Sequence, residues 1–249
     1  AYQREFITAT GRLAVNTQTA HILTLRFDLC EEEHRDRIAN DLFRLIEENS
    51  DCLTTGSAGT PSVLSLLTSL GRHDLAARVL FRDDMPSWLY AVRHGATTIW
   101  ERWDGIQPDG AFANPEFNSF NHPLGSCIAA WLVSCVAGIG FYRSPMYADI
   151  LLHPRFTEGM SFASGWHRTP YGVIRCGWRL SGVEAQVEVS VPVSCEALVI
   201  LENAWLGNVR EKDGDFLHSP GVKRAWQSDN DVFVRVDAGN YEFTWRFEL

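Results

Sequence analysis

Residues 183–191, VEAQVEVSV, alternate between apolar and polar side chains over their whole length. The apolar positions are Val183, Ala185, Val187, Val189 and Val191. Because successive side chains of a β-strand point to opposite faces, this alternation predicts a strand with one face in a core and the other in water. Further short apolar runs, bounded by Gly, Pro, Asn and Asp, occupy residues 148–154, 172–180, 196–201, 232–236 and 241–249. They predict that the later part of the chain is an antiparallel β-sandwich.

The earlier part of the chain has its apolar residues at the spacing of an α-helix. In segment 16–29, Asn16 is a good N-cap, and Ala20, Leu23 and Phe27 share one face. Further helices are predicted at residues 30–49, 61–71, 73–81 and 122–140. The last of these is apolar on nearly every side, so we expect it to be buried. Helices joined in pairs by short Gly/Pro turns indicate a helical barrel or bundle.

The change of period from helix to strand sets the expected domain boundary. It lies near residues 141–146, FYRSPM, where Pro145 ends the last helix. We therefore expect a helical domain over residues 1–142 and a β-sandwich domain over residues 143–249.

Composition excludes several classes of function. The formal charge of −9, with no Lys/Arg cluster, argues against a nucleic-acid partner. None of the six cysteines forms a CxxC pair or stands at a metal-type spacing from a histidine, so we expect no metal and no cofactor. No apolar run reaches the length of a membrane span, so we expect no membrane partner. The cysteine pattern and the lack of a signal peptide favour the cytoplasm, and the first residues, AYQREF, leave this open because they lack an initiator Met.

One carboxylate stands out in residues 97–105, TTIWERWDG, where Glu101 lies between Trp100 and Trp103. It is either a solvated surface residue or an ionisable group beside a ring-shaped ligand. The surrounding region, residues 82–122, concentrates carboxylates, aromatic rings, amides and imidazoles. Such a set suits a polyhydroxylated ligand, whose hydroxyls need many directed hydrogen bonds and whose hydrolysis needs an acid and a base. The GxSxG elbow and the phosphate-loop motif are absent.

Neighbouring residues have structural interpretations as well. His122 is in a position to start a helix and make a structural hydrogen bond. Asp104, directly before Gly105, is typical of a turn. Asp83 and Asp84 are interpreted as a turn that flanks a helix, and the alternative is that this loop reaches a neighbouring sugar.

Several stretches together resemble the C-terminal part of bacterial family 78 α-L-rhamnosidases. They are LTTGSAGTP at 53–61, DDMPSWLYAVRHGATTIWERWDG at 83–105, NSFNHPLGS at 118–126, TPYGVIRCGWRL at 169–180 and VEVSVP at 187–192. The resemblance covers nearly the whole chain. It implies a six-hairpin (α/α)6 catalytic barrel followed by a small β-sandwich, and inverting hydrolysis of terminal α-L-rhamnosyl groups.

The resemblance also implies roles for single residues. Glu101 matches the general base that activates the attacking water, and His122 matches a histidine that contacts rhamnose. Trp100 and Trp103 match wall residues of the same pocket. No metal is implied.

The family's general acid lies in an upstream motif of the DExxGW type, which these 249 residues lack. The chain also has only about half of the helices of a full barrel. Residues 1–142 therefore resemble the C-terminal half of the catalytic barrel, with the general acid outside this chain. The alternative is a catalytically incomplete unit that binds carbohydrate or is purely structural. With a half-barrel, we expect apolar faces such as those of the Ile22, Leu23 and Leu64 helices to associate with the missing half or with a second copy.

Overall fold

The computed structural model describes residues 1–114, 116, 118–142, 149–212 and 214–247. By packing, the chain divides into two compact units, Ala1–Ala129 and Ala130–Leu249. The predicted boundary at residues 141–146, with its stop at Pro145, lies largely outside the described residues. The predicted domain limits at residues 142 and 143 stay predictions. Within the described ranges, no helix is long and apolar enough to cross a membrane.

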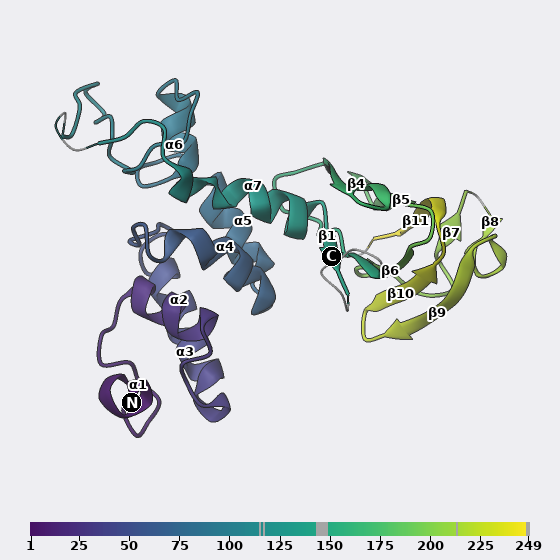
Figure 1. Cartoon of the computed structure of the whole chain (residues 1–249), viewed down its shortest axis with the longest axis horizontal. Helices are drawn as coiled ribbons and strands as arrows, with labels where there is room; N and C mark the ends of the chain where they lie inside the picture. Colours follow the sequence, from purple (N-terminus) through teal and green to yellow (C-terminus); the bar gives the residue numbers. More distant parts are fainter. Residues whose placement is uncertain (115, 117, 143–148, 213, 248–249) are drawn as a thin grey trace. The chain divides into compact units, whose positions relative to one another are not determined.

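The first unit is helical, as predicted. Its helices are α1 (Tyr2–Phe6), α2 (Gln18–Arg26), α3 (Glu32–Glu47), α4 (Thr60–Ser69), α5 (His73–Phe81) and α6 (Trp88–Arg93). Helix α2 packs on α3, α4 packs on α5, and α2 also contacts α4 (Figure 1). The core between them is formed by Ile22, Leu25, Ile38, Leu42, Ile46, Leu64, Leu67 and Leu75, all at most 2% exposed.

Helix α2 differs from its prediction in its start and in its buried face. The N-cap is Thr17, whose hydroxyl accepts a hydrogen bond from the Ala20 N–H at 3.2 Å. Phe27 lies beyond the last helical residue and is 63% exposed. The buried residues of the helix are instead Gln18, His21, Ile22, Thr24 and Leu25. The Gln18 amide donates to the Cys52 carbonyl at 3.0 Å and accepts from the Thr54 N–H at 2.8 Å. A polar side chain can be buried in this way because its hydrogen bonds are satisfied.

The helix faces that were expected to be exposed and to associate with another chain are more buried than expected. Ile22 and Leu64 are 0% and 2% exposed, because the two helix pairs pack their apolar sides against each other. Ile22 and Leu64 therefore do not present an exposed face, whereas Leu23 is half-buried. Association with the missing half or with a second copy stays a prediction.

The predicted helix at residues 122–140 is divided into three types of helical turn. It begins as the 3-10 helix η1 (Pro123–Ser126), continues as α7 (Cys127–Trp131) and ends as the π-helix η2 (Leu132–Val136). Trp131 and Val136 are buried, whereas Val133 is 38% exposed. The expectation of burial on all sides is therefore wrong, since the described residues cover only one side of this segment.

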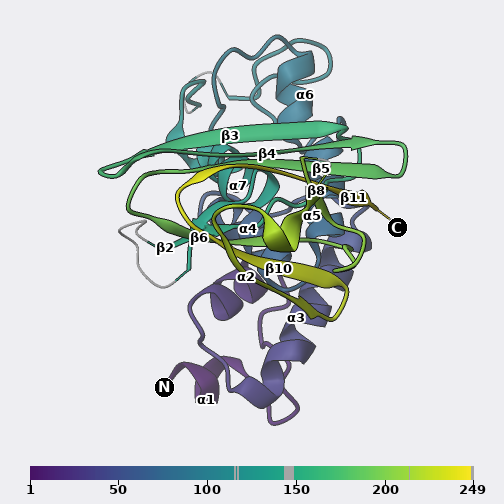
Figure 2. The same cartoon turned by 90° about the vertical axis from the view of Figure 1, so that its right-hand side faces the viewer.

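The second unit is a β-sandwich. Its strands are β1 (Ile139–Phe141), β2 (Asp149–Leu152), β3 (Phe162–Thr169), β4 (Gly172–Ser181), β5 (Glu184–Val191), β6 (Glu196–Leu201), β7 (Arg210–Glu211), β8 (Gly214–Asp215), β9 (Val222–Ser228), β10 (Asp231–Val236) and β11 (Gly239–Arg246), with the 3-10 helix η3 (Phe216–His218). One sheet has the order β1-β2-β6-β10-β9 and the other β3-β4-β5-β11-β7-β8 (Figure 2). All strand pairs are antiparallel except β2 with β6, which are parallel. The predicted antiparallel arrangement is therefore wrong at this one pair.

The strand predicted from residues 183–191 is confirmed as β5. Ala185, Val187, Val189 and Val191 are buried, and the polar residues between them are exposed or half-buried. Val183 is the exception, at 57% exposed, because it precedes the strand in the turn that joins β4 to β5. The alternation therefore predicts the strand correctly and its first residue incorrectly.

Candidate active site

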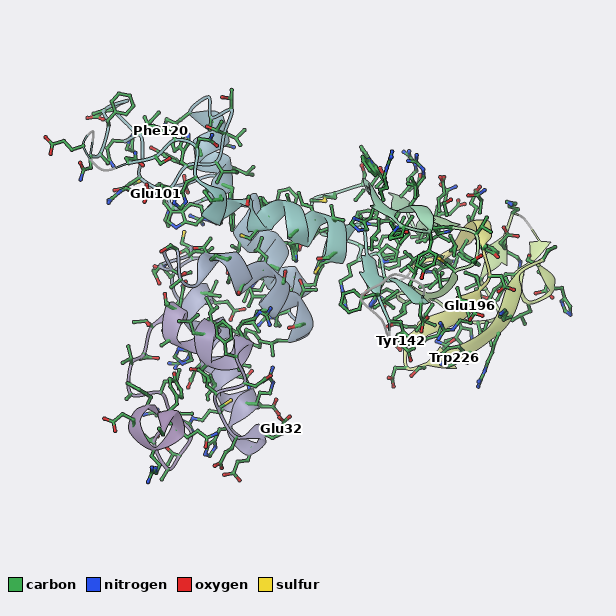
Figure 3. The ribbon with its side chains drawn as sticks, viewed as in Figure 1. Glu32, Glu101, Phe120, Tyr142, Glu196 and Trp226 are labelled. Carbon is green, nitrogen blue, oxygen red and sulfur yellow. The ribbon has the colours of Figure 1, made fainter. Side chains whose placement is uncertain are left out.

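Glu101 lies on a long irregular segment between α6 and η1, and two parts of this segment run side by side. The Glu101 N–H donates to the Ser119 carbonyl at 2.8 Å, and the His122 N–H donates to the Ile99 carbonyl at 2.8 Å. The Thr98 hydroxyl donates to the Phe120 carbonyl. These bonds hold residues 98–101 against residues 119–122, and Figure 3 labels Glu101 and Phe120 on the two parts.

The Glu101 carboxylate is fixed by one of its two oxygens. Its Oε2 accepts a hydrogen bond from the Ser119 N–H at 3.0 Å. Its Oε1 has no hydrogen-bond donor among the described residues, and the side chain is exposed. A carboxylate that is oriented through one oxygen can accept a proton from water with the other.

Close packing against Gly125 and Trp88 holds residues 98–101 in place. Gly125 lies against Ile99, and a Cβ added at Gly125 would stand 2.6 Å from the Ile99 Cγ2. The Gly125 carbonyl accepts a hydrogen bond from the Trp88 indole at 3.1 Å. Trp88 in turn packs edge-on against Trp103, with ring centroids 5.0 Å apart. Only glycine allows the chain to pass Ile99 this closely.

The two predicted tryptophans are both half-buried and have different contacts. Trp103 donates from its indole nitrogen to the Thr55 carbonyl at 3.2 Å, which ties it to the loop before α4. Trp100 packs edge-on against Phe120, with centroids 5.3 Å apart. Each ring is thus held by contacts that leave part of its surface accessible.

Glu101, Trp100 and Trp103 line one cavity of about 730 Å3. Its walls are mainly apolar, and most of them come from α6 and the segment that follows it. The polar side chains on its lining are Ser57, Thr60, Ser87, Thr97, Thr98, Glu101, Arg102 and Asp104. A mainly apolar cavity of this size with a few directed polar groups is typical of a small-ligand site.

His122 is brought to the same segment but not to the cavity. Its main chain pairs with Ile99, two residues before Glu101, and the side chain is half-buried. His122 is not among the described residues that line the cavity. Its predicted contact with a sugar stays a prediction.

Asp104 is the second carboxylate on the cavity lining, and it is already paired. Arg102 donates to both of its oxygens, at 3.0 and 3.1 Å. The hydrogen bonds from Arg102 lower the pKa of Asp104 below its usual value. It therefore stays ionised at neutral pH and is poorly suited to donate a proton.

The other aspartates of this region also have structural partners. Asp83 pairs with Arg93, and Asp84 pairs with Arg82 at 3.3 Å. Asp109 accepts a hydrogen bond from the Ala111 N–H at 2.9 Å. Glu101 is therefore the carboxylate of the cavity lining that makes no ion pair with a described residue, although the nearby Arg102 guanidinium interacts with it electrostatically.

Three residues that build this site are not among the residues predicted from the sequence. Ser119 orients the carboxylate, Gly125 supports Ile99, and Thr55 holds Trp103. Ser119 and Thr55 act through main-chain atoms, which any residue type supplies, so the sequence carries no signal for them. Gly125 lies in a stretch whose apolar pattern predicts a helix, and a glycine there is the one signal of a close approach.

Among the described residues, Glu31, Glu33 and His34 are the group whose ligand atoms are close enough to share a metal ion, within 4.8 Å of one another. They surround the start of α3, and none of them lines the cavity.

Comparison with known proteins adds to this geometry. Residues 1–136 match the family model described as bacterial α-L-rhamnosidase six-hairpin glycosidase domain. The chain belongs to the bacterial α-L-rhamnosidase family. Residues 138–214 of this rhamnosidase-family chain match the bacterial α-L-rhamnosidase C-terminal domain. The resemblance found in the sequence and the expected fold are both confirmed.

Two curated relatives show how much of a rhamnosidase the chain represents. An α-L-rhamnosidase of Streptomyces avermitilis is 32% identical over 244 residues, which are 98% of this chain and 23% of that protein. One from Formosa agariphila is 30% identical over 233 residues, 94% of this chain and 25% of that protein. The chain thus spans about a quarter of the length of these relatives.

A solved structure agrees with the fold. The crystal structure of Streptomyces avermitilis α-L-rhamnosidase complexed with L-rhamnose superposes with a TM-score of 0.90 at 31% identity. The match covers 98% of this chain and 23% of that one.

Proposed function

We propose that this chain is the part of an inverting α-L-rhamnosidase that carries the general base, Glu101. The observation that carries the proposal is the state of its carboxylate, with Oε2 held by the Ser119 N–H and Oε1 open at the edge of a cavity walled by tryptophan rings. Family membership, and a relative whose structure holds L-rhamnose, support a terminal rhamnosyl group of a glycoside or oligosaccharide as the substrate.

In this proposal, water lies between Glu101 Oε1 and the anomeric carbon of the bound sugar. Glu101 takes a proton from the water as the water oxygen bonds to that carbon, and the bond to the leaving oxygen breaks on the opposite face. The leaving oxygen needs a proton, which Asp104 is poorly suited to give because Arg102 keeps it ionised. The general acid is then supplied by a part of the longer protein that this chain does not contain.

A leaving group that needs no proton tests this assignment. We expect the chain to hydrolyse 2,4-dinitrophenyl α-L-rhamnoside, because dinitrophenolate departs without acid assistance, and to be far slower on the methyl glycoside. Glu101→Gln keeps the shape of the side chain and should lower turnover about 10²- to 10⁴-fold, the usual contribution of a general base. Glu116→Gln is the matched control, since Glu116 is an exposed residue of the same segment outside the cavity lining.

A second function, rhamnose binding without catalysis, is favoured by the pairing of Asp104 with Arg102, which leaves the cavity one unpaired carboxylate. It predicts binding of L-rhamnose with no turnover of the dinitrophenyl glycoside. Saturation-transfer NMR with L-rhamnose on the same protein sample distinguishes the two functions. Equal turnover by the wild type and Glu101→Gln would rule out Glu101 as the base.

A further inference from the structure

The outer face of the six-stranded sheet carries a second hollow, separate from the cavity at Glu101. It has a volume of about 560 Å3 and is lined from strands β3, β4, β5 and β11, which lie side by side (Figure 2). Alternate residues of these strands point away from the sandwich core, so the face is made of side chains that the core does not need. We call this hollow the ring groove. The side chains that the argument uses are Phe162, Ser164, Trp166, Arg175, Gln186 and Glu188.

Two large rings stand at the edge of the ring groove. Phe162 and Trp166 lie on β3, the edge strand of the sheet, and each is 60% exposed. They are four residues apart on one strand, so they share a face at a separation of roughly 13 Å. Within the described part of the chain, no other ring packs on Trp166, whereas the Arg179 guanidinium lies over one face of Phe162, 5.7 Å from the ring centroid. Large rings are usually buried, and two of them exposed on one face indicate a binding surface.

The residues between Phe162 and Trp166 have small side chains. Ser164 of β3 is paired with Gly177 of β4, and Gly177 is paired with Glu188 of β5. Gly177 has no side chain to fill the space, and a Cβ there would stand 2.9 Å from the Ser164 Cβ. Ser164 thus fills the space beside Gly177, and a serine and a glycine, which have little or no side chain, are what lies between Phe162 and Trp166.

Polar groups beside the rings are free to bind a ligand. Arg175 is paired with Trp166 across the strands, and Glu188 is paired with Gly177. Both are exposed, and neither side chain makes an ion pair or a hydrogen bond with another described residue. Gln186 is oriented by its amide, which donates to the Glu242 carboxylate at 2.7 Å.

This chemistry fits a neutral polyhydroxyl ligand. The groove is lined by charges of both signs, Arg175, Arg179 and Lys212 beside Glu188 and Glu242. Such a mixed set attracts neither anions nor cations as a class, but it donates to and accepts from hydroxyl groups, which can do both. A protein partner fits less well, because the centre of a protein interface is depleted of charged residues, whereas here the charges are central and the rings lie at the edge.

We propose that the ring groove binds an oligosaccharide chain. Trp166 and Phe162 stack on two different sugars of the chain, because their separation exceeds the width of one sugar ring. Arg175 and Glu188 bind hydroxyls of the sugars between them. This site holds a glycan without acting on it, and it does not depend on the function proposed for Glu101.

Native affinity electrophoresis of the whole 249-residue chain tests the proposal. The gels contain rhamnogalacturonan I, arabinogalactan or xylan, with a gel without polysaccharide as reference. We expect slower migration in at least one polysaccharide gel. Trp166→Ala should raise the dissociation constant about tenfold, because an aromatic contact is lost. Trp166→Phe should retain part of the binding.

The matched control is Trp205→Ala. Trp205 is also on the sandwich unit, is 62% exposed and does not line the ring groove, so its loss should leave migration unchanged. Circular dichroism of each variant checks that the strands are intact. Equal binding by wild type and Trp166→Ala, or no slower migration in any gel, would overturn the proposal.

A competitor separates this site from the cavity at Glu101. Free L-rhamnose at a saturating concentration should leave the slower migration in place, because one sugar cannot span both rings. If L-rhamnose abolished it, the binding would belong to the cavity and the ring groove would be excluded. Failure of the dinitrophenyl glycoside assay would leave this result unaffected.

Discussion

The segment that carries Glu101 and the sheet that carries the ring groove position their side chains by different means. Glu101 is placed by a few individual contacts, chiefly the Ser119 N–H and the close approach of Gly125 to Ile99. Trp166 and Arg175 are placed by strand register, which is repeated along the whole length of β3 and β4. The first arrangement depends on single atoms, and the second is supported at many positions.

This difference bears on how each surface responds to substitution. A loop built from single contacts should lose its function when one of them is disturbed, with little loss of stability elsewhere. A sheet face should tolerate changes in its outer residues and respond to changes in the core behind it. The variants below compare these two responses.

Among the variants that disturb the supports of the two surfaces, Gly125→Ala should have the largest effect. The added methyl group would meet the Ile99 Cγ2 at 2.6 Å, so Ile99 or the main chain must shift. Because Ile99 pairs with His122 on the same segment as Glu101, the carboxylate should move with it. A displacement of about 1 Å can cost roughly 10²-fold in rate. Turnover of the dinitrophenyl glycoside measures this loss.

Gly207→Ala is the control for that variant. A Cβ at Gly207 has no atom within 4 Å, so the methyl group enters open space. We expect wild-type turnover from Gly207→Ala. If Gly125→Ala also kept the wild-type rate, the close packing at Ile99 would not be what positions Glu101.

The sheet can be tested with two valines of the stretch that predicted it. Val187 is 0% exposed and Val183 is 57% exposed. Val187→Ala removes about two buried carbon groups and should lower the free energy of unfolding by about 2 kcal/mol. Val183→Ala should stay within about 0.5 kcal/mol of the wild type. Urea unfolding of both variants measures the difference, and equal losses would mean that the strand alternation does not reflect burial.

The strands could be predicted because their signal is repeated. In β5 each buried valine is separated from the next by a polar residue, and one irregular position, Val183, does not obscure the pattern. The helices were also predicted from spacing, but single residues at their ends were not. Gln18 lies on the buried face of α2 because it makes hydrogen bonds with Cys52 and Thr54. These partners are distant in sequence, so the spacing of apolar residues does not predict them.

The site was predictable only in part for a related reason. Glu101, Trp100 and Trp103 were identified from a short motif, and all three line one cavity. The pairing of Arg102 with Asp104 could have been anticipated from their spacing, since both side chains are close in sequence. The main-chain bonds from Ser119 and Thr55 could not, because every residue type offers the same N–H and carbonyl groups.

The smallest effect concerns acid stability, which should differ between the two units. The helical unit has an ion cluster in which Asp74 accepts from Arg72 at 3.0 Å and from Arg78 at 2.8 Å. Partial burial alone would raise the pKa of Asp74, but hydrogen bonds from the two arginines lower it to about 2, from 3.8. Because the folded pKa is the lower one, the ionised carboxylate stabilises the fold above about pH 4, and this stabilisation is lost as the pH falls towards 2.

Asp74→Asn removes that dependence. The side chain is nearly half exposed, so the difference in unfolding free energy between the wild type and Asp74→Asn should be only about 0.5–1 kcal/mol at neutral pH. It should be mostly lost by pH 2, where about half of the folded-state Asp74 carboxyls and nearly all of the unfolded-state ones are protonated. Urea unfolding followed by the helical circular dichroism signal, repeated from pH 6 to about pH 2, measures it. Asp28→Asn, which breaks an exposed pair with Arg35, is the control and should follow the wild type throughout. If the curves of the wild type and Asp74→Asn ran parallel over the whole range, the ion cluster would not be the source of acid sensitivity in the helical unit.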